Sequence, residues 1–348
     1  MVPRKSLPFL NGKINFPLCL APMVGLSHVS LRKIVREYLP PDAKTLWPTE
    51  MLNSRRLPSE DLALVPESFR DDAESELVPQ ILGNDEKYIA PSVRKLVDWG
   101  AEAIDINMGC PVQKALRHNY GVSLMGDVQY ASSVASMTVK NSTVPVSVKL
   151  RAGAQNDLDF LRKFVKSLED VGVSWVTLHP RTAEQKRRGQ ADWSQINFLK
   201  NNVSIPVIGN GDIQTSSDVL EMLSSTGCDS VMAGRALAAR PWMMWQLAED
   251  LGWETGRSER APRTQEEEGA EYGKVLNRLL ENLLELHNED LALRKFRFHV
   301  RTTSVWLLFG HDLYSKVMSQ RTGATTKLAV QDFFDKPQAM SEKTELRQ

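Results

Sequence analysis

Eight short apolar runs, spaced as strands that alternate with helices, constrain the fold of this chain more than any other feature. Several of them, such as VPVSVKL and IPVIGN, are apolar at both alternating positions, which is typical of parallel strands covered on both faces. Helical patterns lie between the runs, and one of them has Asp157 as N-cap and Gly172 just past its end. The runs cover residues 16–21, 45–48, 77–82, 103–107, 144–150, 175–178, 205–208 and 230–232. This spacing predicts an α/β fold, a (β/α)8 TIM barrel, and no G-x-G-x-x-G turn favours a doubly wound sheet instead.

The pattern changes after residue 252. Residues 254–269 form a polar, charged stretch that contains Pro and Gly, and residues 272–287 (YGKVLNRLLENLLELH) have the period of an amphipathic helix. We therefore predict a barrel domain over residues 1–252, a linker over 253–265 and a smaller all-α helical-bundle domain over 266–348.

Composition sets the class of protein. The chain has 348 residues, of which 42% are hydrophobic and 25% charged, as in globular proteins. No apolar run reaches the length of about 18 residues that spans a membrane, and residues 1–13 lack the apolar stretch of a signal peptide. We expect a cytoplasmic protein without a membrane segment. The three cysteines have no metal-ligand spacing, so we expect free thiols and no metal site.

The charge of the chain is balanced overall but unevenly distributed. Lys and Arg number 43, and so do Asp and Glu. Between residues 291 and 330, however, seven basic residues face only Asp312. A basic stretch of this kind is either a solvated face or a surface for a polyanion.

Polar residues follow most of the predicted strands at the end where barrel enzymes carry their chemistry. Amide, ammonium and imidazole groups are therefore expected to converge on one mouth of the barrel. The residues at these strand ends are Pro22, Met23, Gln80, Asn107, Cys110, Lys149, His179, Asn210, Gly211, Asp212, Gly234 and Arg235.

Four features of this group suggest chemistry. A buried Lys149 requires an anionic ligand or a carboxylate partner such as a structural Asp. The NGD and AGR turns after the last two strands are placed where barrels bind phosphate, with Arg235 as a charged donor. His179 is either a structural donor or a functional group. Cys110 lies in a loop, where filling space explains a cysteine less well than in a core.

These residues stand within motifs that resemble the tRNA-dihydrouridine synthases of the bacterial type. The similar segments are APMVGLSHVSLRKI, PQILGND, IDINMGCPVQKALRHNYGVSLM, VSVKLRAG, LHPRT, VIGNGDI and VMAGRA, in the family's order over nearly the whole chain. Two positions depart from the family pattern: Pro180 replaces a Gly after His179, and Val24 follows APM. Pro180 restricts the backbone beside His179.

The resemblance implies reduction of the C5=C6 bond of uridine in tRNA to dihydrouridine by FMN, which NADPH reduces in turn. Cys110 would be the general acid that protonates C5, while hydride from the flavin goes to C6. The residues implied to bind FMN are Pro22, Met23, Val24, Gln80, Lys149, His179, Asn210, Gly211, Asp212, Gly234 and Arg235. Those implied to contact the substrate are Asn107, Lys114, Arg181, Arg294, Lys295 and Arg297. We expect a monomer that binds tRNA through the basic helical surface.

Three alternatives stay open on the sequence. Another FMN barrel oxidoreductase could act on a small dihydropyrimidine-like molecule without needing the basic helices. A phosphate-binding lyase could use Lys149 as a Schiff base, but would leave Cys110 unexplained. A non-catalytic RNA-binding protein would show no turnover.

Overall fold

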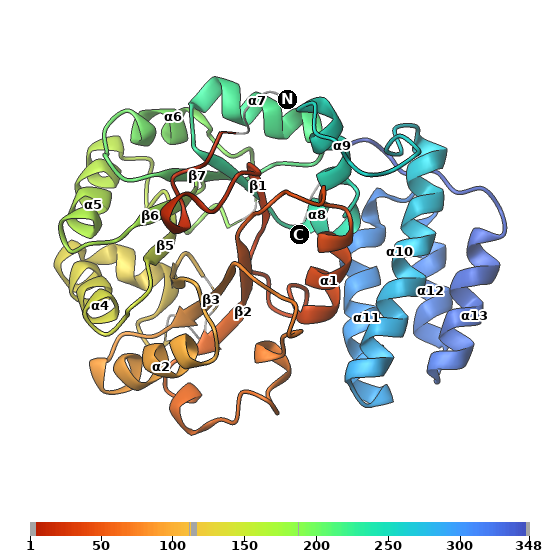
Figure 1. Cartoon of the computed structure of the whole chain (residues 1–348), viewed down its shortest axis with the longest axis horizontal. Coiled ribbons are helices and arrows are strands. Elements are labelled where there is room, and N and C mark those ends of the chain that lie inside the picture. The colour runs from red at the N-terminus through yellow and green to blue at the C-terminus, as the bar shows by residue number, and fades with distance from the viewer. Residues whose placement is uncertain (1–4, 111, 113–116, 187, 346–348) are drawn as a thin grey trace.

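The chain forms a barrel of eight parallel strands, with four further helices packed against one side (Figure 1). The computed structural model describes residues 5–110, 112, 117–186 and 188–345. The sheet order is β1-β8-β7-β6-β5-β4-β3-β2, and Thr45 Oγ1 donates to the carbonyl of Leu18 at 2.6 Å across the remaining seam. The strands are Leu18–Leu20 (β1), Trp47–Asn53 (β2), Leu77–Leu82 (β3), Ile104–Met108 (β4), Val146–Arg151 (β5), Trp175–His179 (β6), Val207–Asn210 (β7) and Ser230–Ala233 (β8). The predicted TIM barrel is confirmed, and each strand overlaps its predicted run.

Helices cover the outside of the barrel and form the group of helices at its side. Those that follow the strands are Val29–Glu37 (α1), Glu86–Asp98 (α2), Val128–Lys140 (α4), Leu158–Asp170 (α5), Ser194–Lys200 (α6), Ser216–Thr226 (α7), Arg235–Ala239 (α8) and Met243–Asp250 (α9). The side group consists of Gln265–Leu286 (α10), Glu289–Thr303 (α11), Gly310–Ser319 (α12) and Gly323–Phe334 (α13). The predicted N-cap of α5 is confirmed, because Asp157 Oδ1 accepts from the N–H of Phe160 at 2.9 Å. Among the described residues, no helix is long and apolar enough to cross a membrane.

The interior of the barrel is apolar at its base and polar at its mouth. Inward-facing side chains such as Cys19, Val78 and Ile208 form a separate cluster with Phe9 and Ile14 of the N-terminal segment. Phe9 closes the base of the barrel by edge contact with Trp175, at 5.6 Å between ring centroids. Because alternate residues of a strand face the same side, the next inward positions carry the polar groups of the mouth.

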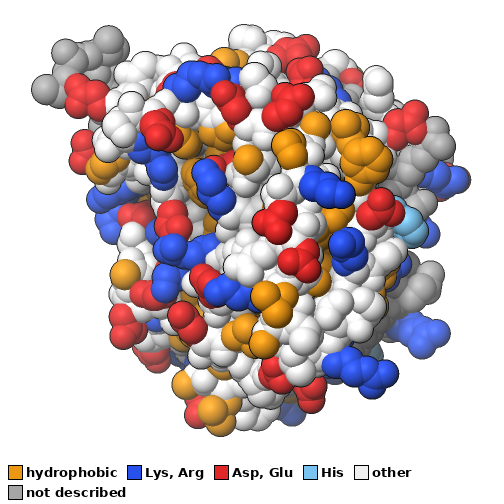
Figure 2. Space-filling view, turned by 90° about the vertical axis from the view of Figure 1, so that its right-hand side faces the viewer, with side chains coloured by type: hydrophobic (Ala, Val, Ile, Leu, Met, Phe, Trp, Pro, Cys, Tyr) orange, Lys and Arg blue, Asp and Glu red, His pale blue; other side chains and the backbone are white. Residues whose placement is uncertain are grey.

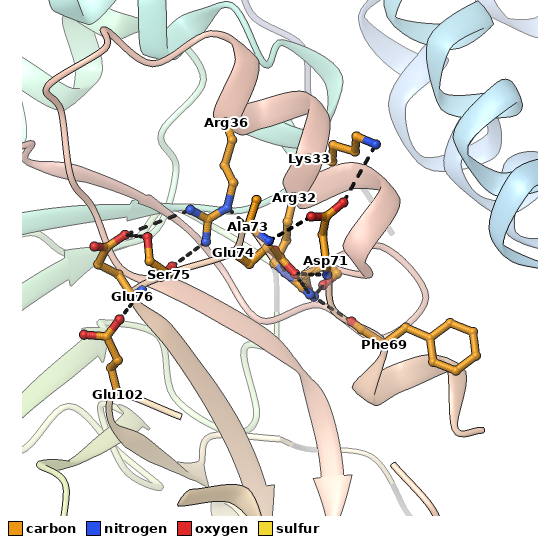
Figure 3. Close-up of polar contacts among 11 residues, drawn as sticks. Arg32, Lys33, Arg36, Phe69, Asp71, Ala73, Glu74, Ser75, Glu76 and Glu102 are labelled. Atoms are coloured by element: carbon orange, nitrogen blue, oxygen red, sulfur yellow. Dashed lines mark hydrogen bonds and ion pairs between the residues drawn. The ribbon is translucent and has the colours of Figure 1, made fainter. Parts of the chain in front are cut away.

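The connection between β2 and β3 contains two short 3-10 turns, Leu57–Ser59 and Pro66–Ser68, and no α-helix. Arg32 of α1 holds this connection: its guanidinium donates to Glu74 at 2.7 and 2.8 Å and to the carbonyl of Phe69 at 3.0 Å (Figure 3). Arg32 is fully buried, so this bidentate pair replaces the packing that a helix would supply. Arg36, one turn further along α1, donates to the carbonyl of Ser75.

The side helices pack directly on the barrel, with α10 against α1 and α11 against α8. Glu268 of α10 is almost buried and accepts from Arg240 at 3.0 Å and from Trp242 at 3.1 Å. Satisfied polar contacts of this kind fix one arrangement of the two parts.

The chain then returns to the barrel after α13. Met340 pairs with Leu307 in an isolated bridge, and Arg240 donates to the carbonyl of Ser341. Lys343 pairs with Asp218 at 2.5 Å, at the start of α7. The C-terminal segment, residues 339–345, therefore lies across both the side helices and the barrel.

Candidate functional site at the barrel mouth

A polar network links β3, β4 and β5 inside the barrel. Gln80 donates to Asp105 at 2.6 Å and accepts from Asn107 at 2.7 Å, while Ser147 donates to the second carboxylate oxygen of Asp105 at 2.6 Å. Burial raises the pKa of Asp105, against the effect of these donors and of the Lys149 charge. Gln80 is fully buried, and both ends of its amide are engaged within the protein.

Asn107 positions the loop that carries Cys110. Its Oδ1 accepts from the backbone N–H of Gly109 at 3.1 Å and of Cys110 at 2.9 Å. The free Cys110 thiol is partly exposed where β4 ends. Gly121 packs on this loop with a φ of +59°, and an added Cβ would lie 2.5 Å from the carbonyl oxygen of Cys110. Both contacts favour one backbone path for the Cys110 loop.

Lys149 lies on β5, the strand next to the one that carries this loop, and is partly buried in the mouth. Its ammonium donates to Asn210 Oδ1 at 3.0 Å, and Asn210 is itself fixed by the carbonyl of Met232 at 2.7 Å. Among the described residues Lys149 makes no ion pair, so the direct Lys–Asp pair considered from sequence is not what holds it. Burial and the charge of Arg151 lower the pKa of Lys149 to about 8. An anion beside the ammonium would offset that burial.

His179 ends β6 and is kept neutral. Burial and the charges of Lys149, Arg151, Arg181 and Arg235 lower its pKa well below the usual value. Arg181 Nη1 lies 3.2 Å from His179 Nε2, and because a guanidinium only donates, Nε2 accepts and Nδ1 carries the ring hydrogen. Pro180 forms a tight turn here, in which the N–H of Arg181 donates to the carbonyl of His179 at 2.8 Å.

Arg181, which the resemblance implies to contact the substrate, is engaged in contacts within the protein. It is only 6% exposed and donates to both oxygens of Asp212, at 2.7 and 2.8 Å. Asp212 also accepts from the N–H of Ala191 at 2.6 Å. The pair therefore ties the loop after β6 to the turn after β7 and leaves little of the Arg181 side chain exposed.

Of the two glycine turns predicted to bind phosphate, the one at Gly211 has a backbone path that excludes a larger residue. Gly211 has a φ of +121°, and an added Cβ would lie 2.8 Å from Ala191 and 3.0 Å from His179. At Gly234 an added Cβ would lie 3.2 Å from the sulfur of Met23. Arg235 follows directly and begins α8.

A cavity of about 1070 Å³ lies beside these turns. Its walls come from the loop after β6, the turn after β7, Arg235 and the C-terminal segment. Basic side chains from these walls include Arg188, Arg235 and Lys343. Acidic side chains, among them Asp212, Asp218 and Glu221, line the same cavity, so its walls carry charges of both signs, and Arg235 is the cation next to a turn predicted to bind phosphate.

The loop after β1 lies next to the Gly234 turn and is held from two sides. Met23 accepts from the N–H groups of Leu26 and Ser27, which makes a tight turn, and Pro22 and Met23 are partly buried. Val24 projects outward and is 56% exposed. The N–H of Gly25 donates to Glu50 of β2 at 2.6 Å.

The basic residues of α11 do not share one face. Lys295 is only 8% exposed and points to the barrel, where its ammonium lies 3.5 Å from the buried carboxylate of Glu50. Arg297 is partly buried and donates to the carbonyl of Gln320 at 2.5 Å. Arg294 and Arg301 are exposed. Lys295 is therefore not part of an exposed basic surface, as the sequence led us to expect, because its position falls among the buried residues of the helix.

Lys114 lies outside the described residues.

Three residues that the sequence analysis did not select also organise the mouth. Arg151 donates to the carbonyl of Gly109 at 2.9 Å and to that of Lys186 at 2.7 Å, so it joins the Cys110 loop to the loop after β6. Glu50 joins α11 to the loop after β1, and Gly121 supports Cys110. An Arg two residues beyond Lys149 and a Glu within an apolar strand were signals that could have identified two of them. Within the described part of the chain, no group of three or more His, Cys, Asp or Glu residues could hold a metal ion.

Comparisons with known proteins agree with the motifs. A protein of Rickettsia conorii named "Probable tRNA-dihydrouridine synthase" is 32% identical over 292 residues, which cover 83% of this chain and 85% of that protein. A protein of the same name from Mycobacterium leprae is 31% identical over 318 residues, covering 84% of this chain and 80% of that protein.

Similarity to solved structures concerns the fold alone. Histamine dehydrogenase from Rhizobium sp. 4-9 aligns with a TM-score of 0.52 at 10% identity, over 77% of this chain and 49% of that chain.

The family profile described as "Dihydrouridine synthase (Dus)" matches residues 19–342, which is most of the sequence. With the motifs in order, these relatives over most of their length and the profile match, the chain belongs to the dihydrouridine synthase family.

Proposed function

We propose that this protein reduces the C5=C6 bond of uridine in tRNA, with FMN as the hydride carrier and NADPH as the electron donor. The observation that carries the proposal is the fixed, partly exposed Cys110 at the end of β4, on the same mouth as Lys149 of the neighbouring β5 and His179 of β6. In balance, one uridine, one NADPH and one proton give one dihydrouridine and one NADP⁺. The family membership and the tRNA named for the relatives support this substrate.

The residues of the mouth fit a flavin mononucleotide. A group with a phosphate at one end and a ring that gains negative charge on reduction needs cations at both ends. Arg235 lies in the wall of the cavity directly after Gly234, and together with the Gly211 and Gly234 turns it suits the phosphate. Lys149 and the Nδ1–H of His179 suit the electron-rich edge of the ring. When bound, the reduced flavin supplies the hydride that C6 of uracil receives.

Cys110 supplies the proton for C5. Its S–H bond breaks as the new C5–H bond forms, and the thiolate regains a proton from solvent. Asn107 acts first on the protein: its Oδ1 holds the N–H of Cys110, so the loop is already positioned before substrate arrives. A contact from Asn107 to the uracil would require its amide to exchange one of these internal partners.

Residues 266–348 serve as the tRNA-binding part in this proposal. Because Lys295 is buried and Arg297 is engaged, the exposed Arg294 and Arg301 supply the cations of α11. Lys186 and Arg188 add positive charge in the loop after β6. The target uridine leaves its stack to enter the mouth, and contacts of this kind offset that cost of a few kcal/mol. We propose that it acts on tRNA in the cytoplasm, as a monomer.

The experiment is reconstitution with purified protein, FMN, NADPH and an unmodified tRNA transcript. We expect flavin to copurify or to load at one per chain, and dihydrouridine to appear when the digested RNA is measured by mass spectrometry. Free uracil and uridine monophosphate serve as small-molecule controls. Turnover of those molecules but not of tRNA would contradict the proposal, as would a protein that neither binds flavin nor forms dihydrouridine.

A further inference from the structure

An exposed aromatic ring stands at the junction of α11 and the barrel mouth. Phe298 is 42% exposed, although it lies on a helix whose other phenylalanine, Phe296, is fully buried. The ring rests on the loop after β1: an added Cβ at Gly25 would lie 2.9 and 3.0 Å from two of its carbon atoms. One part of the ring is therefore packed on backbone and the rest is open to solvent.

The position of this ring is fixed by the buried contacts beneath it. Gly25 donates to Glu50, and Glu50 pairs with Lys295, which lies one turn before Phe298 on α11. The same loop and the same helix are thus held together by an ionic contact that excludes water, since Glu50 is 1% and Lys295 8% exposed. A ring held in this way loses little freedom when a ligand covers it.

Two exposed guanidinium groups flank the ring. Arg294 and Arg301 lie four residues before and three residues after Phe298, so all three side chains share one face of α11. Neither arginine has a side-chain hydrogen bond or ion pair among the described residues. Acidic residues of α11 stand only in its first turn, at Glu289 and Asp290.

The remaining face of the side helices differs from this one. Figure 2 shows the surface of these helices turned away from the barrel, where basic and acidic side chains are interspersed and hydrophobic ones are scattered between them. Such a mixed surface offers no single sign of charge to a polyanion. Phe298 between two arginines, next to the 56% exposed Val24 of the mouth, is a different arrangement.

From these observations, which rest on the proposed function, we infer that Phe298 is a stacking platform for an unpaired nucleotide of the RNA substrate. The base lies on the exposed part of the ring, and Arg294 and Arg301 bind the phosphates on either side of it. Aromatic rings interleaved with cations are how proteins hold single-stranded nucleotides. The platform borders the mouth, so it binds a nucleotide near the target uridine and adds to the substrate specificity of that site.

The test compares tRNA binding by the FMN-loaded, full-length protein and its variants, measured by fluorescence anisotropy over a series of salt concentrations. Phe298→Ala should weaken binding about 5- to 150-fold, and Phe298→Leu should weaken it similarly because it keeps an apolar side chain without a ring face. Phe298→Trp should retain the affinity. None of these variants should change the salt dependence, whereas Arg301→Gln should lower the slope of log K against log salt by about 0.7.

Phe309 provides the matched control, since it is 61% exposed and lies in the turn before α12. Phe309→Ala should bind tRNA as the wild type does. A photoreactive Phe298→p-benzoylphenylalanine variant should crosslink to one unpaired nucleotide of the tRNA. Circular dichroism and flavin content establish that each variant is folded.

Three outcomes would overturn the platform. One is unchanged affinity in Phe298→Ala and Phe298→Leu while the wild type binds and reduces tRNA, which leaves the proposed function intact. Another is full affinity in Phe298→Leu with a loss in Phe298→Ala, which indicates apolar contact with a protein or a second copy. The third is an equal loss in Phe309→Ala. A wild type that neither binds nor reduces tRNA overturns the proposed function as well, so the two failures are distinguishable.

Discussion

The interior of the barrel mouth and the surface of α11 differ in how closely their sequence determines the position of a side chain. At the mouth, strand ends and a period of two residues direct Gln80, Asn107 and Lys149 inward together. On α11 the clustered basic residues point in three directions: Arg294 outward, Lys295 into the barrel and Arg297 toward Gln320. The number of basic residues on a helix therefore does not predict how many of them are exposed, unless the buried positions of the helix are identified first.

The largest effect should come from the mouth. Cys110→Ala should lower dihydrouridine formation by about 10²–10⁴-fold, the range for losing a positioned general acid. Flavin binding and flavin reduction by NADPH should persist, because neither needs the thiol. Stopped-flow measurement of flavin reoxidation by tRNA checks this. Cys228→Ala is the control, because it removes a buried thiol between α7 and β8. Reoxidation at the wild-type rate would assign the proton to another group, such as the exposed His118.

The next effect sharpens the comparison on α11. Lys295→Met leaves the Glu50 carboxylate buried without its cation and should lower the free energy of unfolding by about 3–5 kcal/mol. Arg294→Met, one residue earlier but exposed, should change it by less than about 0.5 kcal/mol. Urea denaturation measures both.

A paired variant separates charge from packing at the same place. Glu50→Gln combined with Lys295→Met should recover much of the loss, because no uncompensated charge stays buried. If Lys295→Met and Arg294→Met had equal free energies of unfolding, Lys295 would not be the structural residue that its burial indicates.

A smaller effect is expected at the phosphate end of the mouth. Arg235→Ala should weaken flavin binding by about 1.5–3 kcal/mol, through loss of a charge-assisted hydrogen bond. Arg260→Ala removes an exposed ion pair with Glu267 and should leave flavin binding unchanged. Flavin fluorescence titration compares the two, and equal affinities would move the phosphate away from the AGR turn.

The smallest effect is a pH dependence at Lys149. Its pKa is lowered from 10.5 to about 8 in the folded protein, so between these values the unfolded chain holds more protons and wild-type stability rises with pH. Lys149→Met lacks this contribution, so it should be more stable than the wild type below pH 8. The difference should shrink as the pH rises toward 10.5.

Denaturation of the flavin-free proteins across this window is the measurement. If the difference in free energy of unfolding between Lys149→Met and the wild type stays constant with pH, burial of the Lys149 ammonium does not lower its pKa.

Sequence patterns predicted the barrel and its strand-end residues because both depend on local periods that the chain repeats eight times. Lys295 was assigned to the surface because basic residues around it were counted without their helical phase. Its neighbours at 292, 296, 299 and 303 are buried, and drawing that stripe would have placed position 295 at its edge. Arg181 could not be placed from sequence, since its partner Asp212 lies 31 residues away across a loop.

The C-terminal segment gives the order in which the mouth is completed. Strands of the barrel leave the ribosome before residues 339–345, and domains fold as they emerge. Lys343 and Thr344, which line the cavity beside Arg235, are therefore synthesised after all the helices that lie between Arg235 and Lys343 in the sequence. A nascent chain can hold a folded barrel while its cavity is still open on that side. The cavity wall beside Arg235 is thus completed only after residues 339–345 have been synthesised.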